Sequence, residues 1–154
     1  MKIIIEGAGQ VGSHLAKMLS HEGGDITVID DSEARLQRLT TTADVVTVLG
    51  DPSSITVLKD AGCAKADLFI AVNPTTSQTV NIVSSLLAKR LGAKRVIARI
   101  QDEAYLLPEN KLMLRTWDST CSSTRRKSPA TKSSTSSSIR PPRTRWTSPA
   151  ASSS

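Results

Sequence analysis

The residues best suited to chemistry stand near the start of the chain, where glycines recur with the spacing G-x-G-x-x-G. The stretch reads Gly7-Ala8-Gly9-Gln10-Val11-Gly12. In such a stretch the first glycine permits a tight turn, the second lets the backbone approach a pyrophosphate, and the third lets a helix pack closely on a strand. The N–H groups at the start of that helix then face the phosphates. Because the same glycines can make a turn in another α/β fold, the motif gains weight only from the strand and helix around it.

An acidic residue points to the same ligand. Asp30 lies 18 residues after Gly12, at the end of a second apolar run. Dinucleotide-binding folds place a carboxylate there, and it accepts hydrogen bonds from the ribose hydroxyls. Such a carboxylate repels a 2′-phosphate, which favours NAD over NADP, although Arg35, one turn into the next helix, would soften that exclusion. The neighbouring Asp31 is better explained as a solvated turn residue or helix cap.

Further polar residues follow the other apolar runs. Gly50 and Asp51 follow the third run, Asn73 and Pro74 follow the fourth, and Arg99 lies in the fifth. Open α/β sheets bind ligands at the carboxyl ends of their strands, so these residues are expected to line one crevice. Each is unspecific by itself. Glu6, in an otherwise apolar run, has no role that the sequence explains.

Alternating strands and helices must position these residues. Apolar runs predict strands at 2–6, 26–29, 45–49, 68–72 and 95–100, and helical spacing predicts helices at 11–20, 32–39, 53–61 and 76–91. Gly62 and Gly92 suit the ends of the last two helices. The alternation predicts an α/β fold over residues 1–112, with five strands in a doubly wound, Rossmann-like parallel sheet.

The last part of the chain has a different character. The net charge is +6, but residues 1–112 carry −1 and residues 113–154 carry +7, together with 20 serines or threonines. A segment of this composition is predicted to be a disordered Ser/Thr/Arg-rich tail. Its charge suggests nucleic acid, but Trp117 and Trp146 are its only aromatic residues, so nucleic-acid binding is not expected.

Several function classes find no support in the sequence. There is no nucleophile–base set and no Cys/His cluster with metal-ligand spacing. There is no apolar run of 18 residues, and two cysteines without an export signal indicate a cytosolic chain. A hydride-transferring enzyme also needs a second domain to hold its substrate. A ligand-binding module is therefore expected rather than an enzyme, and the amino-terminal half of an NAD-dependent dehydrogenase is the alternative.

The same stretches resemble a known family, the RCK or KTN nucleotide-binding domain of Trk-type potassium-uptake regulatory subunits. The resemblance is collinear over roughly residues 1–112 and rests on the strings at 2–12, 25–30, 50–53, 57–62, 66–72 and 97–100. It implies a cytoplasmic protein, peripheral to the inner face of the plasma membrane, that binds NAD(H) or ATP/ADP. It also implies dimers or rings that gate a membrane potassium transporter. By the family pattern, the residues that line the nucleotide are Gly7 to Val11, Asp30, Asn73, Pro74 and Arg99.

The chain departs from the family pattern at two places. Residues 76–81 lack the acidic residue of the family's S-x-E-x-N segment, and the family's continuation, M-G-I-D and later Y-P-E-x-I-A, is missing after residue 112. A shifted reading frame can be tested on the codons that the amino acids permit. In this frame each new codon consists of the last base of one codon and the first two bases of the next. From Thr116 to Ser137, permitted codons then encode M-G-F-D-L-F-F-Y-P-E-K-I-A-G-D-E-I-V-D-L-I. The hypothesis is that the reading frame slips near Met113 or Leu114, which would make the chain a fragment; a genuine disordered tail is the alternative.

Overall fold

The expected alternation of strands and helices is present in the structure, a computed structural model that describes residues 1–74, 78–107, 109–110 and 120–122. The first half contains β1 (Lys2–Glu6), α1 (Gln10–His21), β2 (Asp25–Asp30), α2 (Glu33–Thr40) and β3 (Val46–Leu49). The second half contains α3 (Ile55–Asp60), the 3₁₀ turn η1 (Cys63–Lys65), β4 (Leu68–Ala71), α4 (Gln78–Leu91), β5 (Arg95–Arg99), the 3₁₀ turn η3 (Glu103–Leu106) and β6 (Thr120–Ser122).

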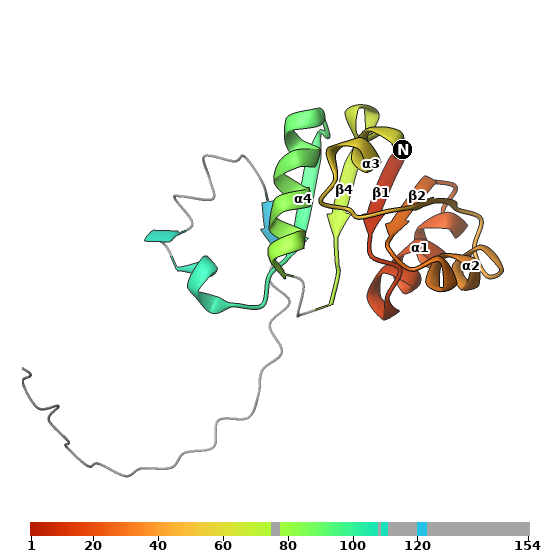
Figure 1. Cartoon of the computed structure of the whole chain (residues 1–154), viewed down its shortest axis with the longest axis horizontal. Helices are drawn as coiled ribbons and strands as arrows, with labels where there is room; N and C mark the ends of the chain where they lie inside the picture. The colour runs from red at the N-terminus through yellow and green to blue at the C-terminus, as the bar shows by residue number, and fades with distance from the viewer. Residues whose placement is uncertain (75–77, 108, 111–119, 123–154) are drawn as a thin grey trace, which may run out of the picture.

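All strand pairs of the described sheet are parallel, in the order β3-β2-β1-β4-β5-β6 (Figure 1). From β1 the chain winds outward through β2 to β3, and it then crosses back to β4 and winds the other way. The five strands and the doubly wound topology predicted from the apolar runs are therefore confirmed. The direction of winding reverses between β1 and β4, and folds of this class bind ligands at the carboxyl ends of the strands at such a reversal point.

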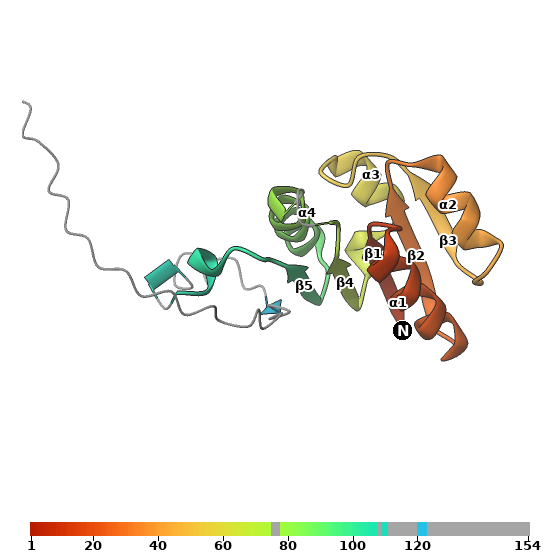
Figure 2. The same cartoon turned by 90° about the horizontal axis from the view of Figure 1, so that it is seen from below.

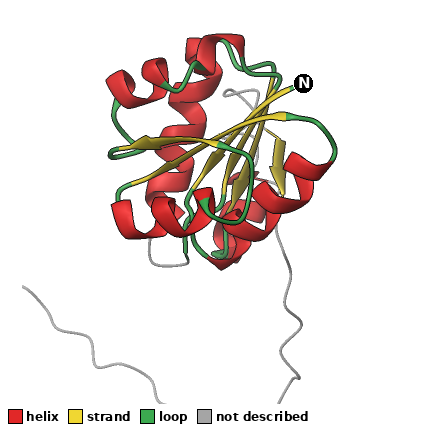
Figure 3. Cartoon of the chain, turned by 90° about the vertical axis from the view of Figure 1, so that its right-hand side faces the viewer, coloured by secondary structure: helices red, strands yellow, loops and turns green. Residues whose placement is uncertain are grey.

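The core consists of two apolar layers, one on each face of the sheet. Side chains of α1 and α2, such as Ala16 and Leu36, pack with Ile3 and Ile5 of β1. On the other face, α3 and α4 cover Ile4. Figure 2 shows α1 and α4 on opposite sides of the strands, and Figure 3 shows helices on both sides of the sheet. Since β1 is buried on both faces, its three consecutive isoleucines are explained by its central position.

Strand β6 was not predicted. Thr120–Ser122 pairs in parallel with β5, within the segment 113–154 whose composition predicts a disordered tail. Three residues are too few to show the two-residue period by which a strand is recognised. The remainder of that segment, and residues 76–77 at the predicted start of the fourth helix, lie outside the described residues.

Gly62 follows α3 with φ +81°, a left-handed conformation that ends the helix as predicted. The adjacent Cys63 is fully buried, and burial raises the pKa of its thiol to about 12, so this cysteine is an unreactive core residue. No helix in the described part of the chain is long and apolar enough to cross a membrane.

Candidate functional site

The glycine-rich turn joins the carboxyl end of β1 to α1, as predicted. Gly7 has φ +98°, and a Cβ there would lie 2.6 Å from Oδ1 of Asn73. A Cβ on Gly12 would lie 1.7 Å from the carbonyl oxygen of Gly7, so helix and turn are in direct contact. Glycine is therefore required at both positions for local packing, whatever the turn binds.

Gly9 differs from the other two glycines, because a Cβ placed on it would meet no atom within 4 Å. Gly9 is also the N-cap of α1, and no side chain caps this end of the helix. The first helical hydrogen bond runs from the N–H of Ser13 to the carbonyl of Gly9, at 2.9 Å. The preceding N–H groups of the first turn are thus available to an anion, with the positive end of the helix dipole behind them.

Asp30 ends β2 next to this turn. Its carboxylate is buried and accepts a hydrogen bond of 2.6 Å from the N–H of Ala8 and one of 2.8 Å from the N–H of Ser32. Arg35 of α2 donates from Nη1 to both carboxylate oxygens, at 3.2 Å each. The predicted ribose-binding carboxylate therefore lies beside the glycine turn, where it also holds Ala8 in place.

Glu6, the residue without an explanation in the sequence, is the centre of a buried polar cluster. Its side chain is fully buried, Oε1 accepts a hydrogen bond of 2.7 Å from Nδ2 of Asn73, and Oε2 is bonded to the hydroxyl of Ser84 on α4. Burial raises the pKa of Glu6 to about 7, and the hydrogen bonds from Ser84 and Asn73 partly oppose this rise.

The hydroxyl of Ser84 can also bond a protonated Glu6. A hydroxyl carries one hydrogen, yet Oγ also lies 2.8 Å from the carbonyl oxygen of Val80, one helical turn earlier. If that hydrogen goes to Val80, a protonated Glu6 completes the chain by donating to Oγ. The cluster is then fully hydrogen-bonded without a buried charge.

Asn81 of α4 connects two strand ends to the helix. Its Oδ1 accepts from the N–H of Asn73 at 3.1 Å, and its Nδ2 donates to the carbonyls of Asn73 and Arg99 at 3.3 and 2.9 Å. The loop after β4 and the end of β5 are thereby held at the same place. Asn73, half-buried, links this assembly to the glycine turn through its contact with Gly7.

The remaining predicted site residues are less directly connected. The N–H of Gly50 donates to the carbonyl of Asp30 at 3.0 Å, which places the end of β3 next to the end of β2. Asp51 is exposed, and its Oδ1 accepts from the N–H and hydroxyl of Ser53, which lowers its pKa. Asp51 thus shapes the turn before α3. Pro74 is exposed, and Arg99 contributes its backbone carbonyl to the bond with Asn81.

The contribution of α4 was missed from the sequence. Its buried face consists of Asn81, Ser84, Ser85 and Ala88. These small and polar residues recur at helical spacing. Together with Glu6 in an apolar strand, they were the sequence signal from which the polar contacts of α4 could have been predicted. The hydroxyl of Ser85 is buried and has no hydrogen-bond partner within the described part of the chain.

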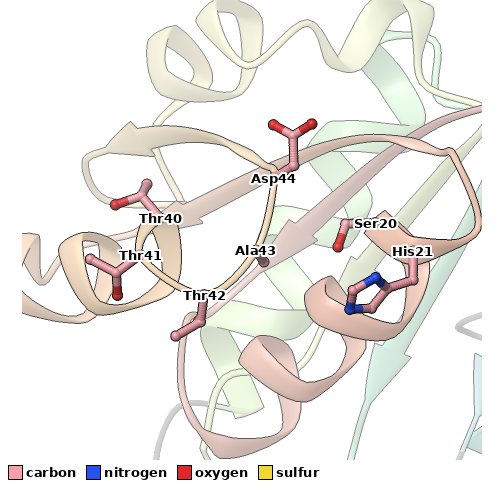
Figure 4. A pocket seen from close by; sticks show the side chains of 7 residues that line it. All are labelled: Ser20, His21, Thr40, Thr41, Thr42, Ala43 and Asp44. Atoms are coloured by element: carbon pink, nitrogen blue, oxygen red, sulfur yellow. The ribbon is translucent and has the colours of Figure 1, made fainter.

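A shallow surface depression of about 420 Å³ lies elsewhere on the molecule (Figure 4). It is lined by residues at the ends of α1 and α2 and before β3, namely Ser20, His21 and Thr40 to Asp44. Because α1 runs from the glycine turn back along the sheet, the depression is at the amino ends of the strands, about 18 Å from the turn for a twelve-residue helix. The Thr40, Thr41 and Thr42 hydroxyls donate to carbonyls of α2, so their hydrogens are already used within the helix.

No group of acidic, histidine or cysteine side chains suited to holding a metal ion occurs within residues 1–74, 78–107, 109–110 and 120–122.

Known proteins resemble the chain along most of its length. The family model described as TrkA-N domain matches residues 3–118. The Trk system potassium uptake protein TrkA of Haemophilus influenzae is 46% identical over 113 residues, which are 73% of this chain and 24% of that protein. The corresponding protein of Halomonas elongata is 47% identical over 107 residues, which are 69% of this chain and 23% of that protein. The chain thus spans about a quarter of the length of these relatives.

Solved structures share the fold. The TrkA-N domain of the inner membrane protein ybaL from Escherichia coli has a TM-score of 0.60 and 21% identity, covering 76% of this chain and 94% of that one. The GsuK channel bound to NAD has a TM-score of 0.61 and 22% identity, covering 77% of this chain and 20% of that one. The match of the family model over most of the sequence, together with this fold, shows that the chain belongs to the TrkA-N domain family.

Proposed function

We propose that residues 1–112 form a nucleotide-binding domain that serves as the ligand sensor of a Trk-type potassium-uptake regulatory subunit. The ligand is an adenine nucleotide, either NAD(H) or ATP/ADP. Binding biases the arrangement of subunits in a dimer or ring, and this arrangement gates a membrane potassium transporter. The chain acts at the cytoplasmic face of the membrane, without catalysing a reaction.

The observation that carries the proposal is the combination of the open position at Gly9 with the carboxylate of Asp30 beside it. The first supports a diphosphate on the uncapped start of α1, because nothing occupies the space where a Cβ of Gly9 would point. The carboxylate supports an adenosine ribose at the end of β2. It accepts a hydrogen bond from the N–H of Ala8, which belongs to the same turn as Gly9. Both lie at the reversal point of the sheet, where folds of this class bind ligands.

The assignment to potassium uptake rests on the relatives. The proteins of Haemophilus influenzae and Halomonas elongata are Trk system potassium uptake proteins. Structures of the similarly folded GsuK were obtained with NAD and with ADP. For this chain, Asn73, Pro74 and Arg99 are proposed to complete the nucleotide site from the neighbouring strand ends, and Gly50 and Asp51 to border it.

Thermal unfolding of the purified chain with NAD⁺, NADH, NADP⁺, ATP and ADP tests the proposal. A ligand that binds the native state at 100 times its dissociation constant stabilises it by about 2.7 kcal/mol, enough to raise the melting temperature by several degrees. We expect such a rise with at least one of these nucleotides. A cooperatively melting sample that responds to none of them would contradict the proposal.

A further inference from the structure

Asp30 has no acceptor capacity left in this structure. Each carboxylate oxygen has two lone pairs. The N–H of Ala8 and Nη1 of Arg35 use Oδ2, and the N–H of Ser32 and the same Nη1 use Oδ1. The two backbone donors are fixed parts of the turns. Arg35 is the exception, because its side chain is 46% exposed while that of Asp30 is 1% exposed.

A ribose with free 2′- and 3′-hydroxyls must therefore compete with Arg35. Such a diol is recognised by donating hydrogen bonds to the carboxylate. The positions from which it would donate are held by the guanidinium of Arg35, so the diol can bond the carboxylate only if this ion pair is displaced. Arg35 thus opposes the ligand that Asp30 by itself selects.

A 2′-phosphate meets the opposite situation. A bare buried carboxylate repels it, but the guanidinium of Arg35 neutralises this carboxylate and belongs to a side chain that is itself partly exposed. A guanidinium has five N–H donors in a planar fork, and Nη1 alone among its nitrogens bonds Asp30. Asp31 is a weak competitor, since its carboxylate is 3.8 Å away and 74% exposed.

We propose that Arg35 determines the ligand specificity of the adenosine subsite, so that the site accepts 2′-phosphorylated adenine dinucleotides as well as unphosphorylated ones. This inference rests on the proposed nucleotide-binding function. It corrects the preference for NAD over NADP that Asp30 alone suggests. Asp30 remains the residue that organises the turn, and Arg35 is the group that contacts the 2′-substituent.

Calorimetric titration of the full chain with NAD⁺ and NADP⁺ tests the inference, because these ligands differ only in the 2′-phosphate. For the wild type we expect the two dissociation constants to lie within about tenfold of each other. Arg35→Gln is expected to weaken NADP⁺ about tenfold or more, the size of one charge-assisted contact, and to leave NAD⁺ equal or tighter. Arg38→Gln removes the same charge from an exposed position on the same helix and is expected to leave the ratio unchanged.

The outcomes distinguish failure of the specificity role of Arg35 from failure of the proposed nucleotide-binding function. If the wild type binds NAD⁺ and rejects NADP⁺ by more than 100-fold, or if Arg35→Gln weakens both ligands equally or neither, the specificity role is wrong and the nucleotide site stands. If Arg38→Gln changes the ratio as much as Arg35→Gln, the effect is one of overall charge, which also overturns the inference. If a folded wild type binds none of NAD⁺, NADP⁺, NADH, ATP and ADP, the proposed function itself fails and this inference fails with it.

Discussion

The buried carboxyl of Glu6 makes the stability of the domain depend on pH. Its pKa is about 7 in the folded chain and near 4.5 when exposed, so the unfolded chain ionises first as the pH rises. Stability is therefore expected to fall by about 3 kcal/mol between pH 4.5 and 7 and to change little above that range. Glu6→Gln should abolish this fall, because an amide keeps the bonds to Asn73 and Ser84 without a charge.

Urea unfolding of wild type and Glu6→Gln at a series of pH values between 5 and 8 measures this difference. The comparison isolates Glu6, because all other titratable groups are common to the two proteins. Parallel stability curves for the two proteins would show that Glu6 is not a neutral carboxyl in the fold.

The glycines of the turn are expected to respond very differently to an added methyl group. Gly12→Ala places a Cβ 1.7 Å from the carbonyl oxygen of Gly7, so the turn must move, at a cost of about 3 kcal/mol or more. Gly9→Ala meets no atom and has φ −72°, so it should change the free energy of unfolding by less than about 1 kcal/mol. Chemical denaturation of both variants checks this, and similar losses in both would mean that the turn is packed differently.

At this scale the sequence predicted which residues lie at the turn but not how they are bonded. The glycines and Asp30 follow a spacing that has a physical reason. The partners of Glu6 could not be found in the same way, because Asn73 and Ser84 are 67 and 78 positions away along the chain. Likewise, Arg35 was placed near Asp30 by helical geometry, whereas its bond to both carboxylate oxygens became evident only from the structure.

Helix α4 is expected to be the element whose loss most disturbs the site, because Asn81 joins it to two strand ends. Asn81→Leu would leave the N–H of Asn73 and the carbonyl of Arg99 unpaired, which should destabilise the fold by about 2–4 kcal/mol. Thr79→Ala, at an exposed position of the same helix, should change stability by less than about 0.5 kcal/mol. Equal effects in thermal unfolding would contradict the role given to Asn81.

The elements themselves were the most predictable level. Five apolar runs became strands β1 to β5, and the helices between them began and ended within a few residues of the expected positions. Some boundaries shifted by one or two residues, as at Val45, which is partly buried but precedes the first residue of β3. The 3₁₀ turns and β6 are three or four residues long, so neither the helical nor the strand period can mark them in the sequence.

Nucleotide binding is expected to be independent of the basic segment at the end of the chain. All proposed site residues lie between Glu6 and Arg99, and residues 113–154 contribute only β6 to the described sheet. Truncation after Leu112 should therefore leave the dissociation constant within about twofold, even if the loss of β6 lowers the melting temperature. Calorimetry on the truncated and full chains checks this, and a folded truncated chain that no longer binds would show that the segment completes the site.

The hypothesis of a shifted reading frame also concerns residues 113–154. The family match ends at residue 118, close to the point at which the alternative frame begins to spell a family-like continuation. Sequencing the gene tests this. An insertion or deletion near codons 113 and 114 would support a frameshift. An unbroken frame without the alternative coding capacity would mean that the basic tail is genuine.

The central claim is that an adenine nucleotide binds on the turn at Gly9, and titration calorimetry of wild type and Gly9→Val tests it most directly. A Cβ at Gly9 meets no atom in the free protein, so we expect the variant to fold, and the valine side chain would extend into the space proposed for the diphosphate. We expect one nucleotide per wild-type chain and affinity at least about tenfold weaker in the folded variant. Equal affinity in the two proteins would contradict the account, because the ligand would then bind elsewhere.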